Sequence, residues 1–296
     1  MTTLQEMYPL FLNDMADLRQ LSQSTLRAYH YELKKAAQYE RFQTALSNIT
    51  LRELETWISR DDVSPSTMSR RASTLSSFFD WAVRHEFCDN NPLQGRTPIR
   101  KKRKLPRPIG NTDHLKRIDK GMTELSSPYQ LLFTILRETG MRVGEVVKLR
   151  LGDVSLRRGS EALRIQEAKN NVERTVVLGP TATPRTIRGL RRVTKTMTMM
   201  GPQELLFRSN RGTQISYDAV HYQWEKLCRN VNLLDDEDRP LYTIHQLRHT
   251  RGSELLAQGH PIEIIQRVLG HKDIRSTLGY AELSEAQVRA ALEDRS

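Results

Sequence analysis

Cysteine is scarce in this chain. Its 296 residues include only Cys88 and Cys228, far apart in the sequence, which excludes a disulfide framework and a cysteine-based zinc pattern. We therefore expect a reducing environment and predict a cytoplasmic location. Residues Met1 to Glu6 lack the basic and apolar stretches of a signal peptide, and no apolar run reaches membrane-spanning length. No membrane partner is expected.

The usual patterns of cofactor-dependent phosphate chemistry are also missing. The sequence has no Asp or Glu cluster with metal-site spacing and no glycine-rich phosphate loop, so we expect neither a metal nor a cofactor. Positive charge is abundant instead, because 46 Lys and Arg residues face 35 Asp and Glu residues, a net charge of +11. This balance favours a polyanionic partner, with nucleic acid ahead of the alternative of an ordinary basic protein.

The first hundred residues carry apolar side chains at helical spacing. Thr50 and Glu53 form a capping-box pattern, while Ser64 and Pro65 match an N-cap followed by the first helical position. These signals predict four helices, each of about 15 to 20 residues, joined by short loops. We interpret residues 1–97 as a small all-helical domain.

A basic, proline-containing stretch follows that domain and shows no periodic apolar face. We interpret residues 98–110 as an exposed, fairly stiff linker. Its basic run comprises Arg100, Lys101, Lys102, Arg103 and Lys104. Such a run is commonly a solvated surface segment, but between two candidate DNA-binding domains we favour contact with the phosphate backbone.

Residues 111–296 read as a second domain in which helices surround a short β-hairpin. The predicted strands cover 162–166 and 174–178, with a turn at 168–171. The chain is thus expected to be mainly α with a small β-sheet. The predicted helices after the hairpin lie near 186–197, 217–231, 244–258, 262–268 and 274–280.

Arginine suits the task of neutralising the oxygens of a phosphate under attack, because its planar fork matches them and its charge is permanent. Arg142 follows Gly140 at a predicted helix-to-helix turn, and Glu145 is three residues further on, where it could orient the guanidinium. His245 and Arg248 are spaced to share one helix face and could reach one phosphate together. Taken singly, each pattern is more often an ordinary polar surface.

A third pattern combines a histidine with a tyrosine near the end of the sequence. His271 follows Leu269 and Gly270, and Tyr280 comes nine residues after this histidine. A lone tyrosine here is normally a packed aromatic with a wet hydroxyl. In a site built around arginines, its hydroxyl is a candidate nucleophile.

Together these motifs resemble the tyrosine recombinase (phage-integrase-like) family over essentially the whole chain. The matches are the Thr-Gly-Met-Arg segment, the His-x-x-Arg box extended by His249 and Thr250, the Leu-Gly-His box, and the tyrosine behind it. A lysine on the hairpin turn, Lys169, is a looser match, because Asn170 and Asn171 replace the commoner glycine-lysine pattern. The resemblance implies catalytic roles for Arg142, Lys169, His245, Arg248, His271 and Tyr280.

The resemblance implies a metal-independent reaction. Tyr280 would attack the scissile phosphate and form a 3′-phosphotyrosine while Arg142 and Arg248 clamp its oxygens. Lys169 would protonate the leaving 5′-oxygen. His245 would accept the tyrosine proton or orient the phosphate, and His271 would hydrogen-bond it. Bond energy kept in the phosphotyrosine lets a partner strand's 5′-hydroxyl reverse the step without ATP.

The resemblance also implies a SAM-like core-binding domain, an α+β catalytic domain, and a C-shaped clamp on double-stranded DNA. Such proteins act as homo-tetramers on two DNA sites through a Holliday junction, sometimes with a related recombinase or accessory proteins. Residues 284–292 read as a short amphipathic tail helix that docks on a neighbouring protomer or on its own domain. Size favours the compact subgroup of Xer-like resolvases, transposon cointegrate resolvases and simple integrases.

Two other functions would use similar residues. A non-catalytic DNA-binding regulator could keep the fold without the chemistry, but the presence of Tyr280 and both arginines argues against it. An enzyme resembling a type IB topoisomerase would nick and reseal one strand without a tetramer. Strand joining between two duplexes distinguishes recombination from relaxation of supercoils.

Overall fold

The computed structural model divides the chain into two compact units, Met1–Arg103 and Lys104–Ser296, and each is considered by itself. Three segments singled out in the sequence fall outside the described residues, namely 101–104 of the basic run, Lys169 and the tail 284–292. Arg100 is described and exposed. The structure describes residues 2–17, 21, 23–100, 105–167, 172–271 and 273–281, without the side chains of 166, 167 and 172.

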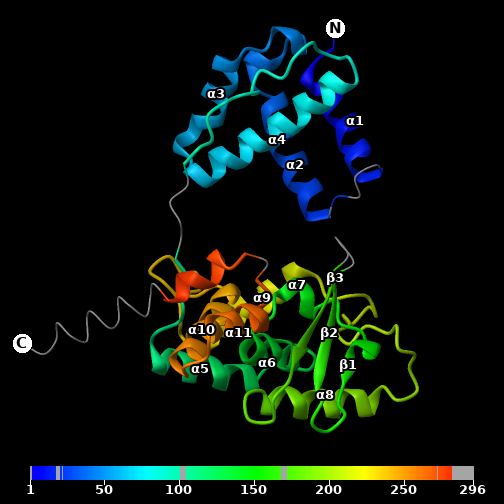
Figure 1. Cartoon of the computed structure of the whole chain (residues 1–296), viewed down its shortest axis with the longest axis vertical. Coiled ribbons are helices and arrows are strands. Elements are labelled where there is room, and N and C mark those ends of the chain that lie inside the picture. Colours follow the sequence, from blue (N-terminus) through cyan, green and yellow to red (C-terminus); the bar gives the residue numbers. More distant parts are fainter. Residues whose placement is uncertain are drawn as a thin grey trace, which may run out of the picture. The chain divides into compact units, whose positions relative to one another are not determined.

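The four helices predicted for unit 1 are present, and Figure 1 labels them. Thr50 and Glu53 form both halves of the capping box at α3, and the Ser64 hydroxyl accepts the Thr67 N–H at 3.3 Å before α4. The predicted length is wrong for α3, which has only 9 residues, because the backbone turns extended at Arg60, with ψ 159°, and Asp61 follows at φ 67°. The bounds are α1 Leu4–Asp17, α2 Gln23–Ala37, α3 Leu51–Ser59 and α4 Pro65–Arg84.

The core of unit 1 is rich in aromatic side chains. Phe11 of α1 meets Phe78 and Trp81 of α4 edge-on, with ring centroids 5.6 and 5.7 Å apart. Trp81 also donates its indole N–H to the Asp14 carboxylate at 2.8 Å, which satisfies its buried polar edge. These contacts tie α1 to α4 across the middle of the unit.

Unit 2 is helical around one antiparallel sheet of strand order β1-β2-β3. The two predicted strands are confirmed as an antiparallel pair, from Ala162↔Val177 to Glu167↔Val172, while the predicted turn at 168–171 lies outside the described residues. The two-residue strand β1 was not predicted, since so short a segment has no periodicity to read. The bounds are α5 Thr112–Thr123, α6 Tyr129–Thr139, α7 Val143–Val146, β1 Val154–Ser155, β2 Ala162–Glu167, β3 Val172–Val177, α8 Pro184–Thr196, α9 Tyr217–Asn230, α10 Ile244–Ala257 and α11 Ile262–Leu269.

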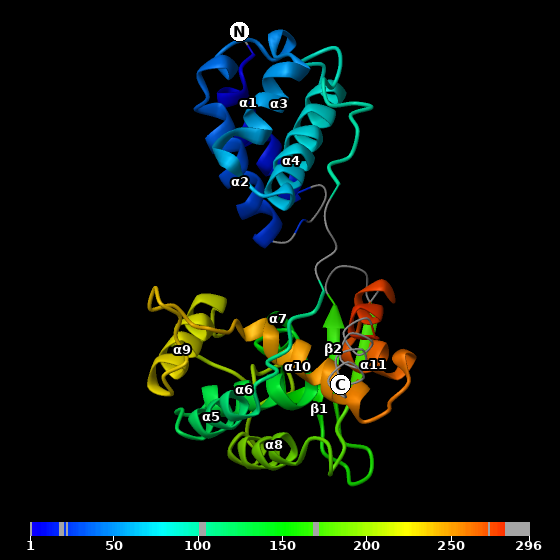
Figure 2. The same ribbon diagram turned by 90° about the vertical axis from the view of Figure 1, so that its left-hand side faces the viewer.

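Helix α6 is central in unit 2, where it packs against both α8 and α10. Figure 2 shows α10 between α6 and α11. The predicted helix boundaries at Gly140 and Gly270 are confirmed, because both glycines are left-handed C-caps, at φ 68° and 66°. Residues 275–281, which include Tyr280, are helical as well.

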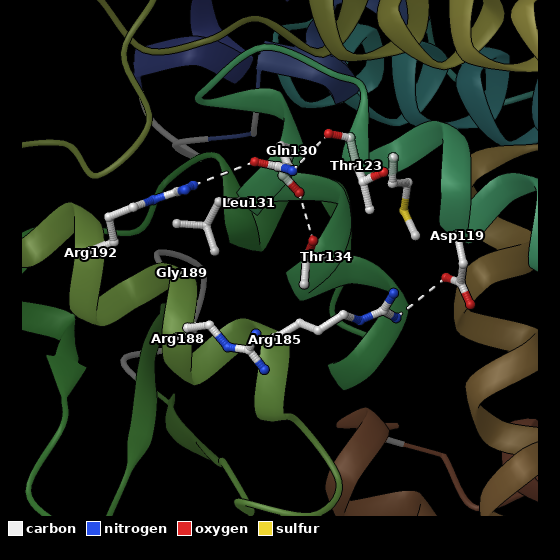
Figure 3. Close-up of a pocket in the computed structure, with 10 residues that line it drawn as sticks. Asp119, Thr123, Gln130, Leu131, Thr134, Arg185, Arg188, Gly189 and Arg192 are labelled. Carbon is white, nitrogen blue, oxygen red and sulfur yellow. Dashed lines mark hydrogen bonds and ion pairs between the residues drawn. The ribbon is translucent and has the colours of Figure 1, made fainter.

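A cavity of about 250 Å³ lies among α5, α6 and α8, and Figure 3 shows its lining. Arg185 reaches from α8 to Asp119 at 3.3 Å and to Glu138 at 2.8 Å. Gly189 permits close packing of α8 on α6, because a Cβ there would lie 2.5 Å from Leu131 Cδ1. The lining includes none of the residues predicted to carry catalysis.

Candidate active site

Arg142 projects from a rigid junction between α6 and α7. It is the N-cap of α7, two residues after the left-handed cap Gly140. Its Nη1 donates to Glu145 Oε1 at 2.9 Å, and its backbone N–H donates to Glu145 Oε2 at 2.7 Å. The carboxylate therefore holds both the backbone and the side chain of Arg142, as its spacing suggested. The Arg142 side chain is 41% exposed and accessible to a ligand.

Arg248 lies deeper, on α10, and is 3% exposed. Its Nη1 donates to the Gly140 carbonyl at 2.7 Å, so α10 is tied to the turn that carries Arg142. Burial, and then the positive charge of Arg142, lowers the pKa of Arg248 to about 10, which leaves it charged at pH 7. Among the described residues, no acceptor hydrogen-bonds its buried Nη2 atom.

Two histidines of α10 pack together one helical turn apart. The rings of His245 and His249 are perpendicular, with centroids 4.8 Å apart. Nδ1 of His249 lies 3.2 Å from the Tyr280 hydroxyl oxygen. Burial lowers the pKa of His245, and it lowers that of His249 to about 4. Both rings are consequently neutral at pH 7 and able to accept a proton.

Tyr280 is folded into the unit, with 1% of its surface exposed. Its ring lies over Gly252 of α10, where an added Cβ would be 2.6 Å from Tyr280 Cζ. The ring is parallel to that of His271, at an interplanar angle of 3° and a centroid distance of 6.3 Å. Burial raises the pKa of Tyr280 to about 12, so the phenol is neutral at pH 7.

His271 follows the left-handed cap of α11 and is fixed by a hydrogen bond. Its Nδ1 lies 2.8 Å from Thr277 Oγ1, which leaves Nε2 as the other ring position for a ligand. Burial, and then the charge of Arg248, lowers the pKa of His271 to about 4. This histidine too is neutral at pH 7.

The structure brings five of the six proposed catalytic residues together, and the sixth, Lys169, lies outside the described residues. Sequence reasoning missed Arg174 of β3, whose Nη2 donates to Glu145 Oε2 at 2.8 Å. It also left His249 without a role. Arg142 and Arg174 both bond the Glu145 carboxylate, and Arg248 is close enough for that charge to affect its pKa. Three guanidiniums thus lie near one carboxylate, and this excess of positive charge suits a phosphate.

Three other features of the described part of the chain concern metal sites, disulfides and membrane-spanning helices. No group of three or more His, Cys, Asp or Glu is arranged there to hold a metal ion. Cys88 and Cys228 are buried free thiols. No described helix is both long and apolar enough to cross a membrane.

The chain matches models of known protein families. The phage integrase family matches residues 111–287, which is more than half of the chain, and the N-terminal SAM-like domain of phage integrases matches residues 9–86. Tyrosine recombinase XerC of Thermodesulfovibrio yellowstonii is 28% identical, over 96% of this chain and 93% of its own length. Tyrosine recombinase XerD of Oceanobacillus iheyensis is 29% identical, over 92% and 91%.

Solved structures share the fold. XerH site-specific recombinase, bound to a palindromic difH substrate, has a TM-score of 0.71 at 21% identity, covering 93% of this chain and 80% of its own. A lambda integrase dimer bound to a core site has a TM-score of 0.70 at 20% identity, covering 94% and 77%. The chain belongs to the phage integrase family. It is a site-specific tyrosine recombinase, and Xer-type recombinases are among its relatives.

Proposed function

We propose that the chain binds a double-stranded DNA recombination site and exchanges strands through a covalent bond to Tyr280. The Tyr280 oxygen attacks the scissile phosphorus, the bond to the 5′-oxygen breaks, and the products are a 3′-phosphotyrosine and a free 5′-hydroxyl. A 5′-hydroxyl from a partner strand then attacks the phosphotyrosine and releases the tyrosine. One phosphodiester is made for each one broken, so no energy source is needed.

Arg142 and Arg248 are the proposed clamp for the non-bridging oxygens. They approach from two elements joined by the Arg248–Gly140 hydrogen bond, so their spacing is set by the packing of α10 on α6. A phosphate oxygen would also satisfy the buried Nη2 of Arg248, a donor that is costly to leave unpaired. Donors fixed before the reaction stabilise developing charge without reorganisation, and one donor typically contributes about 10²- to 10³-fold in rate.

The proton of Tyr280 passes to a histidine in this proposal. With its own proton on Nε2, His249 accepts a hydrogen bond from the tyrosine hydroxyl through Nδ1. Because the phenol is neutral, the proton must leave as the oxygen attacks, and Nδ1 of His249 is the acceptor in contact with it. The low pKa makes this imidazole a weak base in the free protein, and the negative charge of a bound phosphate would raise that pKa. The contact favours His249 over His245 for this role. His271 would donate from Nε2 to a phosphate oxygen.

The remaining predictions concern segments that lie largely outside the described residues. Lys169 is retained as the proposed acid for the leaving 5′-oxygen, on the family resemblance. The basic run Arg100 to Lys104 would lie along phosphates between a core-binding domain at 1–97 and a catalytic domain at 111–296. A cytoplasmic location accords with the two free thiols.

Assembly as a homo-tetramer on two DNA sites is likewise proposed. A lambda integrase tetramer bound to a Holliday junction shares this fold, with a TM-score of 0.65 at 20% identity over 92% of this chain. Residues 284–292 would dock on the neighbouring protomer. A head-to-tail contact of this kind closes into a ring and would link the active sites.

The Tyr280–His249 contact beside three guanidiniums is the observation that carries the proposal. Its test is covalent capture on a nicked DNA site from which the 5′-hydroxyl strand diffuses away. The wild-type chain should become linked to DNA on a denaturing gel, while Tyr280→Phe should bind the site and give no adduct. A normal adduct from this variant would refute the assignment. Joining of strands from two duplexes separates recombination from simple nicking and resealing.

A further inference from the structure

Arg174 of β3 reaches across to the turn that follows α11. Its Nη2 donates to Glu145 Oε2 at 2.8 Å, and its Nη1 donates to the Val268 carbonyl at 3.4 Å. The side chain is 15% exposed. Its guanidinium lies against Gly270, where an added Cβ would be 2.5 Å from Arg174 Cζ. One side chain thereby connects β3, the start of α7 and the end of α11.

Glu145 binds two arginines, and this determines the net charge of the group that they form. Its Oε1 accepts from the Arg142 side chain, while its Oε2 accepts from the Arg142 backbone and from Arg174. Arg142 paired with Glu145 alone would be a neutral ion pair. A second guanidinium on the same carboxylate leaves the trio with one net positive charge, and Arg142 keeps attraction for an anion.

The turn at Gly270 provides a second link to the same arginine. The Gly270 carbonyl accepts from both Nη1 and Nη2 of Arg142 at 3.4 Å. Because the Arg174 guanidinium packs against Gly270 and bonds Val268, it supports the turn that presents this carbonyl. The next residue is His271, so the support extends to the proposed phosphate-binding histidine.

We propose that Arg174 is a positioning residue of the recombinase site, which holds Glu145 and the Gly270 turn so that Arg142 faces the scissile phosphate. The inference rests on the proposed function and adds a residue to it. Arg174 acts on the non-bridging oxygens through Arg142. It differs in this from Lys169, which precedes it in the sequence and would act on the leaving oxygen.

The test compares two DNA sites in single-turnover cleavage by the full chain. One carries the ordinary scissile phosphate, and the other a methylphosphonate, in which a methyl group replaces a charged oxygen and lessens the need for a guanidinium. Arg174→Ala should cleave the ordinary site about tenfold to a hundredfold more slowly than wild type, the range expected for coupled residues. On the methylphosphonate its defect should shrink to a few-fold, as should that of Arg142→Ala.

Arg191→Ala is the matched control. It removes another arginine–carboxylate pair of unit 2, with Nη2 3.0 Å from Glu161 Oε1, and should cleave both sites at the wild-type rate. Should Arg174→Ala fail to fold, the same comparison is made with Arg174→Lys, which keeps the charge but has no planar fork. Binding to a half-site confirms that each variant is folded.

Three results would overturn the inference. Wild-type cleavage of the ordinary site by folded Arg174 variants would remove the positioning role. An equal defect on both sites would mean general disruption. Recovery on a 5′-bridging phosphorothiolate site instead would assign Arg174 to the leaving group. In each case the wild-type adduct with Tyr280 still forms, whereas failure of the proposed function would appear as no adduct from the wild type on any site.

Discussion

The hydroxyl oxygen of Tyr280 lies 3.2 Å from Nδ1 of His249, a residue 31 positions earlier on α10. His245, one helical turn away, touches His249 edge-on rather than standing between it and the tyrosine. The histidine next to the nucleophile is thus the one that follows Arg248 in sequence. The His-x-x-Arg pattern alone gives His245 two possible roles, accepting the tyrosine proton and orienting the phosphate. This arrangement gives the first role to His249 and leaves the second to His245.

Replacing His249 should impair the attack step. His249→Ala removes the proposed proton acceptor, and cleavage should slow by about 10²-fold or more, as for a general base. His249→Gln can still hydrogen-bond the phenol but cannot take its proton, so it should be nearly as slow. Single-turnover adduct formation measures both, with half-site binding as the control. Near wild-type cleavage by His249→Gln would contradict a proton-accepting role and leave only positioning.

Gly252 offers a way to move the nucleophile without changing any polar group. A Cβ at this position would lie 2.6 to 3.0 Å from three ring carbons of Tyr280, so Gly252→Ala should push the ring off α10. Cleavage should fall by about 10²-fold, the cost of a 1 Å misplacement. Tyr280 should also become more accessible, and the rate of its chemical nitration should rise.

The control for this substitution is Gly201→Ala, where no atom lies within 4 Å of the added Cβ. It should leave both cleavage and nitration unchanged. An active Gly252→Ala variant with Tyr280 still protected would show that the helix accommodates the methyl group in another way.

Local sequence patterns were sufficient for much of this fold. Helix periodicity, the capping box at Thr50 and the glycines that end α6 and α11 all act within a few residues, so they can be read directly from the chain. The same holds for Glu145, which is one helical turn from the arginine that it binds. The nine-residue length of α3 was missed because its early end depends on the extended backbone of Arg60 and the positive φ of Asp61 and Asp62, which periodicity does not reveal.

Contacts between distant segments were beyond such reasoning. Arg174 occupies an ordinary strand position, and only the packing of the hairpin on α11 brings it to Glu145 and Gly270. The burial of Tyr280 against Gly252 depends in the same way on two helices meeting. Sequence reasoning considered only His245 as the partner of the tyrosine, and it is the tertiary packing of α10 that places His249 beside the Tyr280 hydroxyl.

The neutral histidines make unit 2 sensitive to acid. Burial lowers the folded-state pKa of His249 and His271 to about 4, below the ordinary value near 6.5. Between these pH values the unfolded chain binds more protons than the folded one. The contribution of these two histidines to the free energy of unfolding is therefore fully present above pH 6.5 and is lost as pH falls toward 4. The urea midpoint of unit 2 should therefore be lower at pH 5 than at pH 7.

Fluorescence of Trp224, which is buried in unit 2, can report this transition when Trp57 and Trp81 of unit 1 are replaced by Phe. The matched variant carries His249→Gln and His271→Gln, which cannot be protonated in this range. It should lose most of the difference between pH 7 and pH 5. If the difference persists in full, other groups are responsible.

The basic run should bind DNA phosphates with little sequence preference. Replacing Arg100 to Lys104 with Ser should weaken binding to all DNA sequences and flatten the fall of affinity with salt, by about 0.9 in log–log slope for each phosphate that is no longer neutralised. Filter binding at several salt concentrations, on a recombination site and on unrelated DNA, measures both effects. An unchanged slope would mean that the run stays in solvent.

Lys169 should act on the leaving group and on nothing else. If it donates the proton to the 5′-oxygen, Lys169→Ala should cleave ordinary DNA slowly, by about 10²-fold or more. It should regain much of the rate on a 5′-bridging phosphorothiolate, because a thiolate leaves without needing a proton. Arg142→Ala is the contrasting variant, since its defect concerns the non-bridging oxygens and should persist on the sulfur substrate. Equal defects of Lys169→Ala on both substrates would assign the acid to another residue.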